Sequence, residues 1–173
     1  YCMKVYSTNH MPKDKIAILK KDEYDFCKRG FFGGRTEVFK MNKKFTDTEL
    51  KRGECGRYVD IQSLYPTVQF FDFLPTGIPK WKTENNVSRK YFEDNYGYHE
   101  VDISPSKDIF IPVLPEKKNG KLLFDVVDKV QTVYTSVELL EAISCGYTVT
   151  KVYRSLVFEK CDNLFKSYIQ KFL

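Results

Sequence analysis

The sequence lacks any run of about 18 consecutive apolar residues, and its first ten residues lack the charged-then-apolar layout of a signal peptide. These absences predict a protein without a membrane partner. No Cys-x-x-Cys pair occurs, so the sequence predicts neither a zinc site nor a disulfide framework. We expect reduced thiols in an intracellular, reducing compartment for the five scattered cysteines, Cys2, Cys27, Cys55, Cys145 and Cys161.

Hydrophobic and aromatic residues are plentiful. The 173 residues are 42% hydrophobic and 16% aromatic, which is enough to build a sizeable core. The net charge is +5, and residues 1–82 hold 16 Lys and Arg against 10 Asp and Glu. A polyanionic partner and a solvated basic surface both account for this modest excess.

The patterns along the chain favour four segments, 1–56, 57–82, 83–130 and 131–173. Residues 28–40 indicate a loop that carries Gly33 and Gly34 and leads into a strand. Residues 57–61 alternate as in a short strand, and Pro66 is typical of the first turn of a following helix. The expected order is strand, tight turn, helix.

The later segments carry clearer local signals. Asn119-Gly120 lies between two apolar runs and predicts a β-hairpin. Thr135 and Glu138 form a capping-box pattern before an apolar helical face that ends at Gly146, and 147–159 is rich in strand-forming residues. The spacing from 164 to 172 predicts an amphipathic helix with Asp162 as its N-cap. This helix has no stop signal, so we expect the chain to be a piece of a longer protein.

Residues 58–69, "YVDIQSLYPTVQ", place one carboxylate, Asp60, before a turn into a helix. A carboxylate at a rigid turn suits Mg²⁺, which prefers oxygen ligands. The backbone N–H groups that open a helix suit phosphate oxygens. The simpler alternative is that Asp60 caps the helix or pairs with a nearby cation.

The Asp60 segment resembles motif A of the family B DNA polymerases, Asp-x-x-Ser-Leu-Tyr-Pro. Upstream, "FFGGRTEVFK" is similar to the Tyr-x-Gly-Gly element of the protein-primed branch, which serves viruses, linear plasmids, organelles and Maverick/Polinton elements. This chain has Phe31 where the branch often has Tyr. The segments after motif A are also similar, so the resemblance covers about residues 28–173.

The resemblance implies an α+β fold, a partial polymerase palm with an antiparallel sheet and packed helices, plus a β-rich insertion over 83–130. It implies DNA-directed DNA synthesis by two-metal phosphoryl transfer with Mg²⁺ or Mn²⁺. Implied partners are a DNA template-primer, deoxynucleoside triphosphates and a terminal priming protein, and implied hosts are a virus, mobile element, linear plasmid or organelle.

Roles for individual residues follow from the same resemblance. Asp60 and the Ile61 carbonyl would bind metal, and Tyr65 would exclude a ribose 2′-hydroxyl. Backbone amides near Ser63 and Leu64 would hold the triphosphate. The residues expected to contact DNA are Lys28, Arg29, Phe31, Phe32, Gly33, Gly34 and Arg35.

Two motifs of the family are missing from these residues: Lys-x-x-x-Asn-Ser-x-Tyr-Gly and the Asp-Thr-Asp motif with the second catalytic carboxylate. We therefore expect that this chain alone does not polymerise DNA. The alternative is a non-catalytic nucleic-acid-binding or structural module, in which Asp60 is only a helix cap.

Two further groups of residues favour structural roles. His99, Glu100 and Asp102 fall on opposite faces of a strand, and we predict a solvated edge strand there. Trp81 is typical of a packing anchor.

Overall fold

A computed structural model describes residues 2–12 and 16–172. Its helices and strands confirm an α+β fold. No helix in these described ranges is long and apolar enough to cross a bilayer. The helices are α1 (Cys2–Asn9), α2 (Lys21–Arg29), α3 (Asp47–Lys51), α4 (Leu64–Phe71), α5 (Arg89–Asp94), α6 (Ser136–Ser144) and α7 (Lys166–Ile169); the strands are β1 (Leu74–Lys82), β2 (Gly97–Pro105), β3 (Glu116–Lys118), β4 (Lys121–Leu123), β5 (Lys129–Thr135) and β6 (Tyr147–Cys161).

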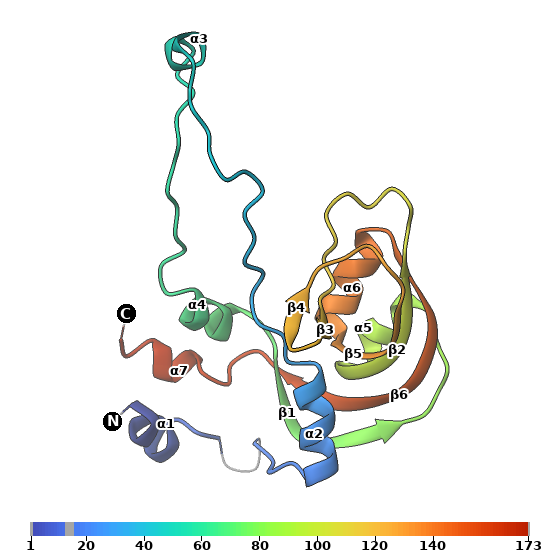
Figure 1. Cartoon of the computed structure of the whole chain (residues 1–173). Helices are drawn as coiled ribbons and strands as arrows, with labels where there is room; N and C mark the ends of the chain where they lie inside the picture. Colours follow the sequence, from blue (N-terminus) through green and yellow to red (C-terminus); the bar gives the residue numbers. More distant parts are fainter. Residues whose placement is uncertain (1, 13–15, 173) are drawn as a thin grey trace.

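Four strands form one antiparallel sheet in the order β1-β6-β2-β5. The fifteen-residue β6 pairs with β2 along its first part and with β1 along its last part, and the sheet curls around α6 (Figure 1). At the crossing of β2 and β6 the backbones approach closely, since a Cβ on Gly97 would lie 2.0 Å from the Leu156 carbonyl oxygen. The sheet thus combines strands from 57–82, 83–130 and 131–173.

The sheet buries apolar side chains on both faces. On one face, α5 and α6 cover the larger cluster, to which Phe92, Tyr134 and Leu139 each contribute a fully buried side chain. On the other face, α2 packs Phe26 and Cys27 against β5 and β6. The two clusters hold the sheet between helices and so fix the position of the loop that follows α2.

The predicted hairpin and capping box are confirmed. Asn119 and Gly120 both have positive φ, 52° and 74°, as a two-residue turn between β3 and β4 requires. The hydroxyl of Thr135 accepts the Glu138 N–H at 3.2 Å and the Glu138 side chain accepts the Thr135 N–H, at the start of α6. Strand β6 covers the predicted 147–159 strand and extends it by two residues.

Residues 36–62 form an arm that projects from the sheet and carries α3 near its tip (Figure 1). The strands predicted after Gly34 and over 57–61 are wrong, because both segments of the arm are irregular backbone. A strand needs a neighbour for its backbone hydrogen bonds, and no described strand lies beside either segment. Asp60 is therefore not part of the sheet.

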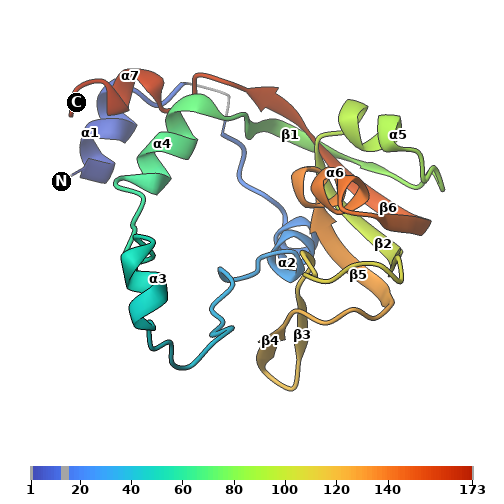
Figure 2. The same ribbon diagram turned by 90° about the horizontal axis from the view of Figure 1, so that it is seen from above.

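The two ends of the chain meet beside α4 (Figure 2). Tyr6 of α1 stacks on Phe165 with ring centroids 4.8 Å apart. The predicted C-terminal helix is confirmed only in part, since α7 covers four residues and its N-cap is Phe165, not Asp162. Asp162 instead forms an ion pair with Lys166 at 3.9 Å, and the helix begins directly after Phe165.

The prediction of a solvated edge strand at His99 is wrong. Strand β2 is an interior strand of the sheet, and the His99 side chain is 0% exposed. The alternation itself is confirmed, because Glu100 points to the opposite face and pairs with Arg154. Trp81 packs on Phe26 with ring centroids 4.9 Å apart, as an anchor should.

Candidate functional site

The turn from Val59 to Pro66 surrounds a hollow of about 620 Å³ at the base of the arm. All five residues predicted here for metal and nucleotide contacts line it: Asp60, Ile61, Ser63, Leu64 and Tyr65. Their side chains are exposed, and the Tyr65 ring is 81% accessible. The structure thus brings this predicted group together without the predicted strand.

The backbone of this turn leaves the start of α4 open. Ser63 is the N-cap and has a left-handed backbone with φ of 53°. Its side chain makes no capping hydrogen bond, so the first amides of α4 are available to an acceptor. Asp60 lies three residues before the cap position and forms no ion pair with any described residue. The alternative in which Asp60 is merely a helix cap or ion-pair partner is therefore not supported.

The geometry provides only part of a metal site. Within residues 2–12 and 16–172, no three His, Cys, Asp or Glu side chains are grouped so that they could hold a metal ion. Asp60 supplies one exposed carboxylate, and the neighbouring Ile61 carbonyl is a second oxygen. Mg²⁺ requires a near-octahedral oxygen set. Asp60 and Ile61 therefore offer two of the oxygens that such a set needs.

The loop after α2 carries the second predicted group. Phe31 is more than half exposed, and its ring lies 6.0 Å from that of Tyr98. Phe32 is half-buried against Tyr134, with centroids 5.6 Å apart. Gly33 and Gly34 follow on the surface, where each lines a hollow of about 380 Å³. The loop thus presents one ring and two glycines outward while the other ring anchors it.

Two predicted DNA-contacting cations are already engaged by the protein. Arg29 lies 2.7 Å from Glu100 and donates to the Gln131 carbonyl at 3.0 Å. Burial acts to raise the pKa of Glu100, but hydrogen bonds from Arg154 and Arg29 outweigh it and hold that pKa below its usual range. Because Glu100 stays ionised, it neutralises part of the positive charge of Arg29.

Arg35 is held in a similar way. Its guanidinium donates to the Pro112 carbonyl at 2.7 Å, pairs with Glu37 and lies 4.9 Å from the centre of the Phe124 ring. The contacts with Pro112 and Phe124 tie the Gly-Gly loop to the segments on either side of the β3–β4 hairpin. Arg35 therefore has a structural role that sequence spacing does not reveal.

A hollow of about 430 Å³ between α2, β5 and the hairpin contains a cation that the sequence analysis missed. Lys28, Arg29 and Phe32 line it, and so does Lys117 of β3. The Lys117 ammonium donates to the Phe31 carbonyl at 2.6 Å and lies 5.2 Å from the Phe32 ring centre. The run of lysines around the predicted hairpin turn was the signal that could have identified it.

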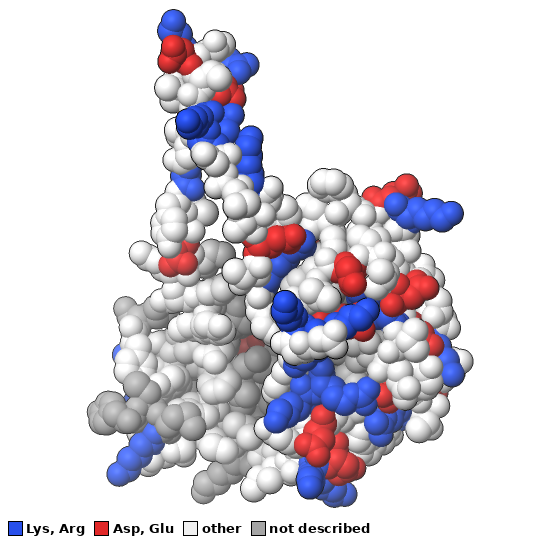
Figure 3. Space-filling view, viewed as in Figure 1, with Lys and Arg blue, Asp and Glu red and all other residues white. Residues whose placement is uncertain are grey.

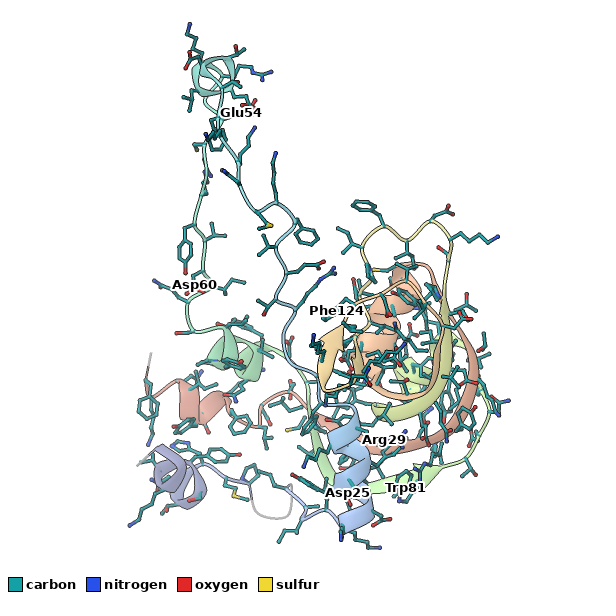
Figure 4. The ribbon with its side chains drawn as sticks, viewed as in Figure 1. Asp25, Arg29, Glu54, Asp60, Trp81 and Phe124 are labelled. Atoms are coloured by element: carbon teal, nitrogen blue, oxygen red, sulfur yellow. The ribbon has the colours of Figure 1, made fainter. Side chains whose placement is uncertain are left out.

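The two predicted groups occupy separate parts of the molecule. Asp60 lies at the base of the arm beside α4, whereas Arg29 lies on α2 in front of the sheet (Figure 4). The arm joins them along the chain. The structure therefore shows two surfaces, the Asp60 turn and the α2 loop, and no contact between them is found in the described ranges.

Comparison with known proteins shows to which family the chain belongs. The family described as "DNA polymerase type B, organellar and viral" matches residues 2–173, nearly the whole chain. The chain belongs to this family.

The relatives of this polymerase segment are fungal. It is 25% identical over 171 residues to a "Probable DNA polymerase" of Ascobolus immersus and 25% identical over 175 residues to one of Neurospora intermedia. These alignments cover 96% and 95% of this chain but 13% and 17% of the relatives. The chain thus spans less than a fifth of the length of these two polymerases.

Solved structures show the same fold. Phi29 DNA polymerase in a ternary complex with primer-template DNA and incoming nucleotides matches 98% of this chain with a TM-score of 0.64 at 19% identity. Its binary complex with primer-template DNA matches 98% of this chain with a TM-score of 0.61, also at 19% identity. The chain covers 30% and 28% of those structures. The fold of this polymerase segment is therefore that of one region of a larger enzyme.

Proposed function

We propose that the chain is part of a DNA-directed DNA polymerase that adds deoxynucleotides to a primer by two-metal phosphoryl transfer. The observation that carries this proposal is the Asp60 turn. An exposed carboxylate without an internal partner lies beside the uncapped start of α4, around a hollow of about 620 Å³. A helix start accepts phosphate oxygens through its amides and its dipole.

Each residue of the turn has a distinct role in this proposal. The amides at the start of α4, at Ser63 and Leu64, bind the triphosphate of the incoming nucleotide. The Tyr65 ring lies over the sugar and leaves no room for a 2′-hydroxyl. Its exposure supports this role, because no described residue covers the ring.

Asp60 and the Ile61 carbonyl supply two oxygens toward Mg²⁺ or Mn²⁺, and the remaining ligands come from outside the described residues. Two such ions, when bound, neutralise the charge that develops on the transferred phosphoryl group. Asp60 alone cannot do this, since a single exposed carboxylate holds Mg²⁺ weakly. We therefore propose that this chain is inactive by itself.

The α2 loop contacts the DNA template-primer. Neither Gly33 nor Gly34 has positive φ, and a Cβ on Gly34 would meet nothing described within 4 Å. The fold does not require these glycines, which supports close approach of the backbone to a DNA strand. Phe31 offers a ring for stacking, and Lys28 and Lys117 provide charge beside it, while Arg29 and Arg35 hold the loop.

The proposal extends to the four segments of the chain. We propose that 57–82 belongs to the palm, that 83–130 contacts a terminal priming protein, and that 131–173 leads back from that insertion toward the fingers. Residues 1–56, which precede these segments, lead into the palm. Family membership over residues 2–173 and the shared fold support these assignments.

Primer extension tests the proposal. In a complete polymerase that contains these residues, Asp60→Asn should lower the rate of extension in Mg²⁺ at least about 100-fold, by loss of a charge-stabilising ligand. The matched control is Asp108→Asn, an exposed acid in the turn after β2, away from the Asp60 turn and the arm, which should leave the rate unchanged. The 173-residue chain alone should give no extension.

Two outcomes would contradict the proposal. Asp60-dependent synthesis by the chain alone would disprove its inactivity. Full activity of Asp60→Asn in the complete polymerase would remove Asp60 from the site and return the chain to the class of non-catalytic nucleic-acid-binding modules.

A further inference from the structure

The arm concentrates the positive charge of the molecule. Residues 40–57 hold six Lys and Arg against three Asp and Glu, a net charge of +3, while the whole chain carries +5. Lys and Arg side chains gather along the upper part of the arm in the space-filling view (Figure 3). More than half of the net charge therefore lies on 18 residues that project from the sheet.

Within residues 40–57 of the arm, most acids form ion pairs, whereas most cations form none. Lys43 pairs with Glu49, and Arg52 lies 3.1 Å from Glu54. Asp47 is the remaining acid, at the first turn of α3. Four exposed cations form no ion pair with any described residue: Lys40, Lys44, Lys51 and Arg57.

Local hydrogen bonds give the tip of the arm a defined shape. Thr46 and Glu49 form a capping box in which the Thr46 N–H donates to the Glu49 carboxylate at 2.8 Å. Gly53, with φ of 79°, then turns the chain back after α3. No residue of α3 is buried, so this helix contributes no side chain to the hydrophobic core. These contacts place the unpaired cations on both limbs of the arm.

We infer that the arm binds the sugar-phosphate backbone of duplex DNA through Lys40, Lys44, Lys51 and Arg57. The arm projects from the sheet and carries these exposed cations on both limbs and on α3, which suits a double-stranded polyanion. A single strand is usually enclosed by a groove with stacked rings, and the hollows at the Asp60 turn and beside the α2 loop are lined by residues outside 40–57. The inference rests on the proposed function, since the duplex would be the primer-template of the polymerase.

Salt-dependent binding tests this inference. The 173-residue chain is titrated against a labelled duplex of about 20 bp by fluorescence anisotropy, without divalent metal, across about 50 to 200 mM salt. The test variant carries Lys40→Gln, Lys44→Gln, Lys51→Gln and Arg57→Gln. The control carries Lys80→Gln, Lys107→Gln, Lys151→Gln and Lys171→Gln, which are exposed on the rest of the molecule and form no ion pair with described residues.

The test variant should lose about 2 to 4 units from the slope of log K against log salt, because each lost phosphate contact removes about 0.9. Its affinity at about 100 mM salt should fall at least about 10-fold. The control should change the slope by less than about 1. Circular dichroism of both variants should match the wild type, since the substituted side chains are exposed.

Three results would overturn the inference: an unchanged slope in the test variant, an equal loss in the control, or arm-dependent binding that prefers single-stranded DNA. Failure of the proposed function at Asp60 would give a different combination of results in the primer-extension and salt-titration experiments. If Asp60→Asn leaves primer extension intact while the arm variant still loses its salt slope, the polymerase chemistry is wrong at Asp60 and the arm binds DNA nonetheless.

Discussion

The buried imidazole of His99 is held in one tautomer by hydroxyl groups on both sides. Tyr91 donates to Ser155 at 3.1 Å, and the hydroxyl of Ser155 lies 2.8 Å from Nδ1 of His99. On the other side Nε2 lies 2.8 Å from Ser136, whose hydroxyl donates to the Asn95 carbonyl at 2.9 Å. All four hydrogen bonds can form together only if Nε2 of His99 carries the proton and donates to Ser136, while Nδ1 accepts a hydrogen bond from Ser155.

Among the described residues no acid forms an ion pair with the ring, and this environment suits neutral histidine. Burial lowers the pKa of His99 to about 4 from its usual 6.5, although the nearby Asn95 backbone acts in the opposite direction. The unfolded chain binds a proton below pH 6.5 and the folded chain does not until about pH 4, so folding stability falls as pH falls between these values.

We predict that His99 makes the fold acid-sensitive. Between pH 7 and pH 5 the free energy of unfolding should drop by about 2 kcal/mol through this residue. Urea unfolding at both pH values measures it, with His99→Gln as the comparison. The drop should be smaller by that amount in His99→Gln, and an identical drop in both proteins would show that His99 does not titrate on unfolding.

Single residues also show which contacts can be predicted from the sequence and which cannot. The Asp60 pattern predicted which residues surround the hollow at α4, because motif and turn are contiguous in the chain. Sequence spacing, by contrast, predicts that Arg29 and Arg35 are both available to DNA. Arg29 pairs with Glu100 and Arg35 donates to the Pro112 carbonyl, both more than 70 residues away in sequence, so only the folded chain shows these two contacts.

At the scale of helices and strands, signals confined to a few residues were reliable. The capping box of α6 and the Asn119-Gly120 turn both formed as predicted, since each depends on backbone groups within four residues. The strand predicted over 57–61 did not form, because a strand is stabilised by its neighbour and none of the described strands lies beside it. Alternation alone gives no information about that neighbour.

Helices α3 and α6 begin with the same capping box but in different surroundings. Thr135 starts α6, which buries Leu139 and Ala142 against the sheet, whereas Thr46 starts α3, which buries no residue. Loss of a cap costs global stability only where the helix is coupled to the core. The two threonines are therefore a matched pair for testing that coupling.

We predict that Thr135→Ala lowers the free energy of unfolding by about 1 kcal/mol and that Thr46→Ala lowers it by less than about 0.3 kcal/mol. Denaturant unfolding, with a probe of the sheet core such as near-ultraviolet circular dichroism, measures both. Equal losses in the two variants would show that the arm is part of the cooperative unit that includes the sheet.

The whole molecule combines a sheet held between helices with an arm that contributes little to either core. The clusters around Phe92 and Phe26 include no residue of 36–62. The arm instead exposes apolar side chains, among them Tyr58 at 99% and Val59 at 82%. Exposed apolar side chains of this kind form a surface that no described part of the chain covers.

Hydrogen exchange should therefore divide the molecule in two. Within the described ranges, the amides of 55–61 donate no backbone hydrogen bond, whereas those of β2 and β6 pair along the interior of the sheet. We predict that β2 and β6 exchange on the order of 1,000-fold more slowly than 55–61, because their exchange requires unfolding of the sheet and that of the arm does not. Exchange followed by mass spectrometry on peptides from both regions measures the ratio. Protection of 55–61 equal to that of β2 would mean that the arm folds onto the sheet in solution, and the cations of the arm would then lack the exposure on which duplex binding depends.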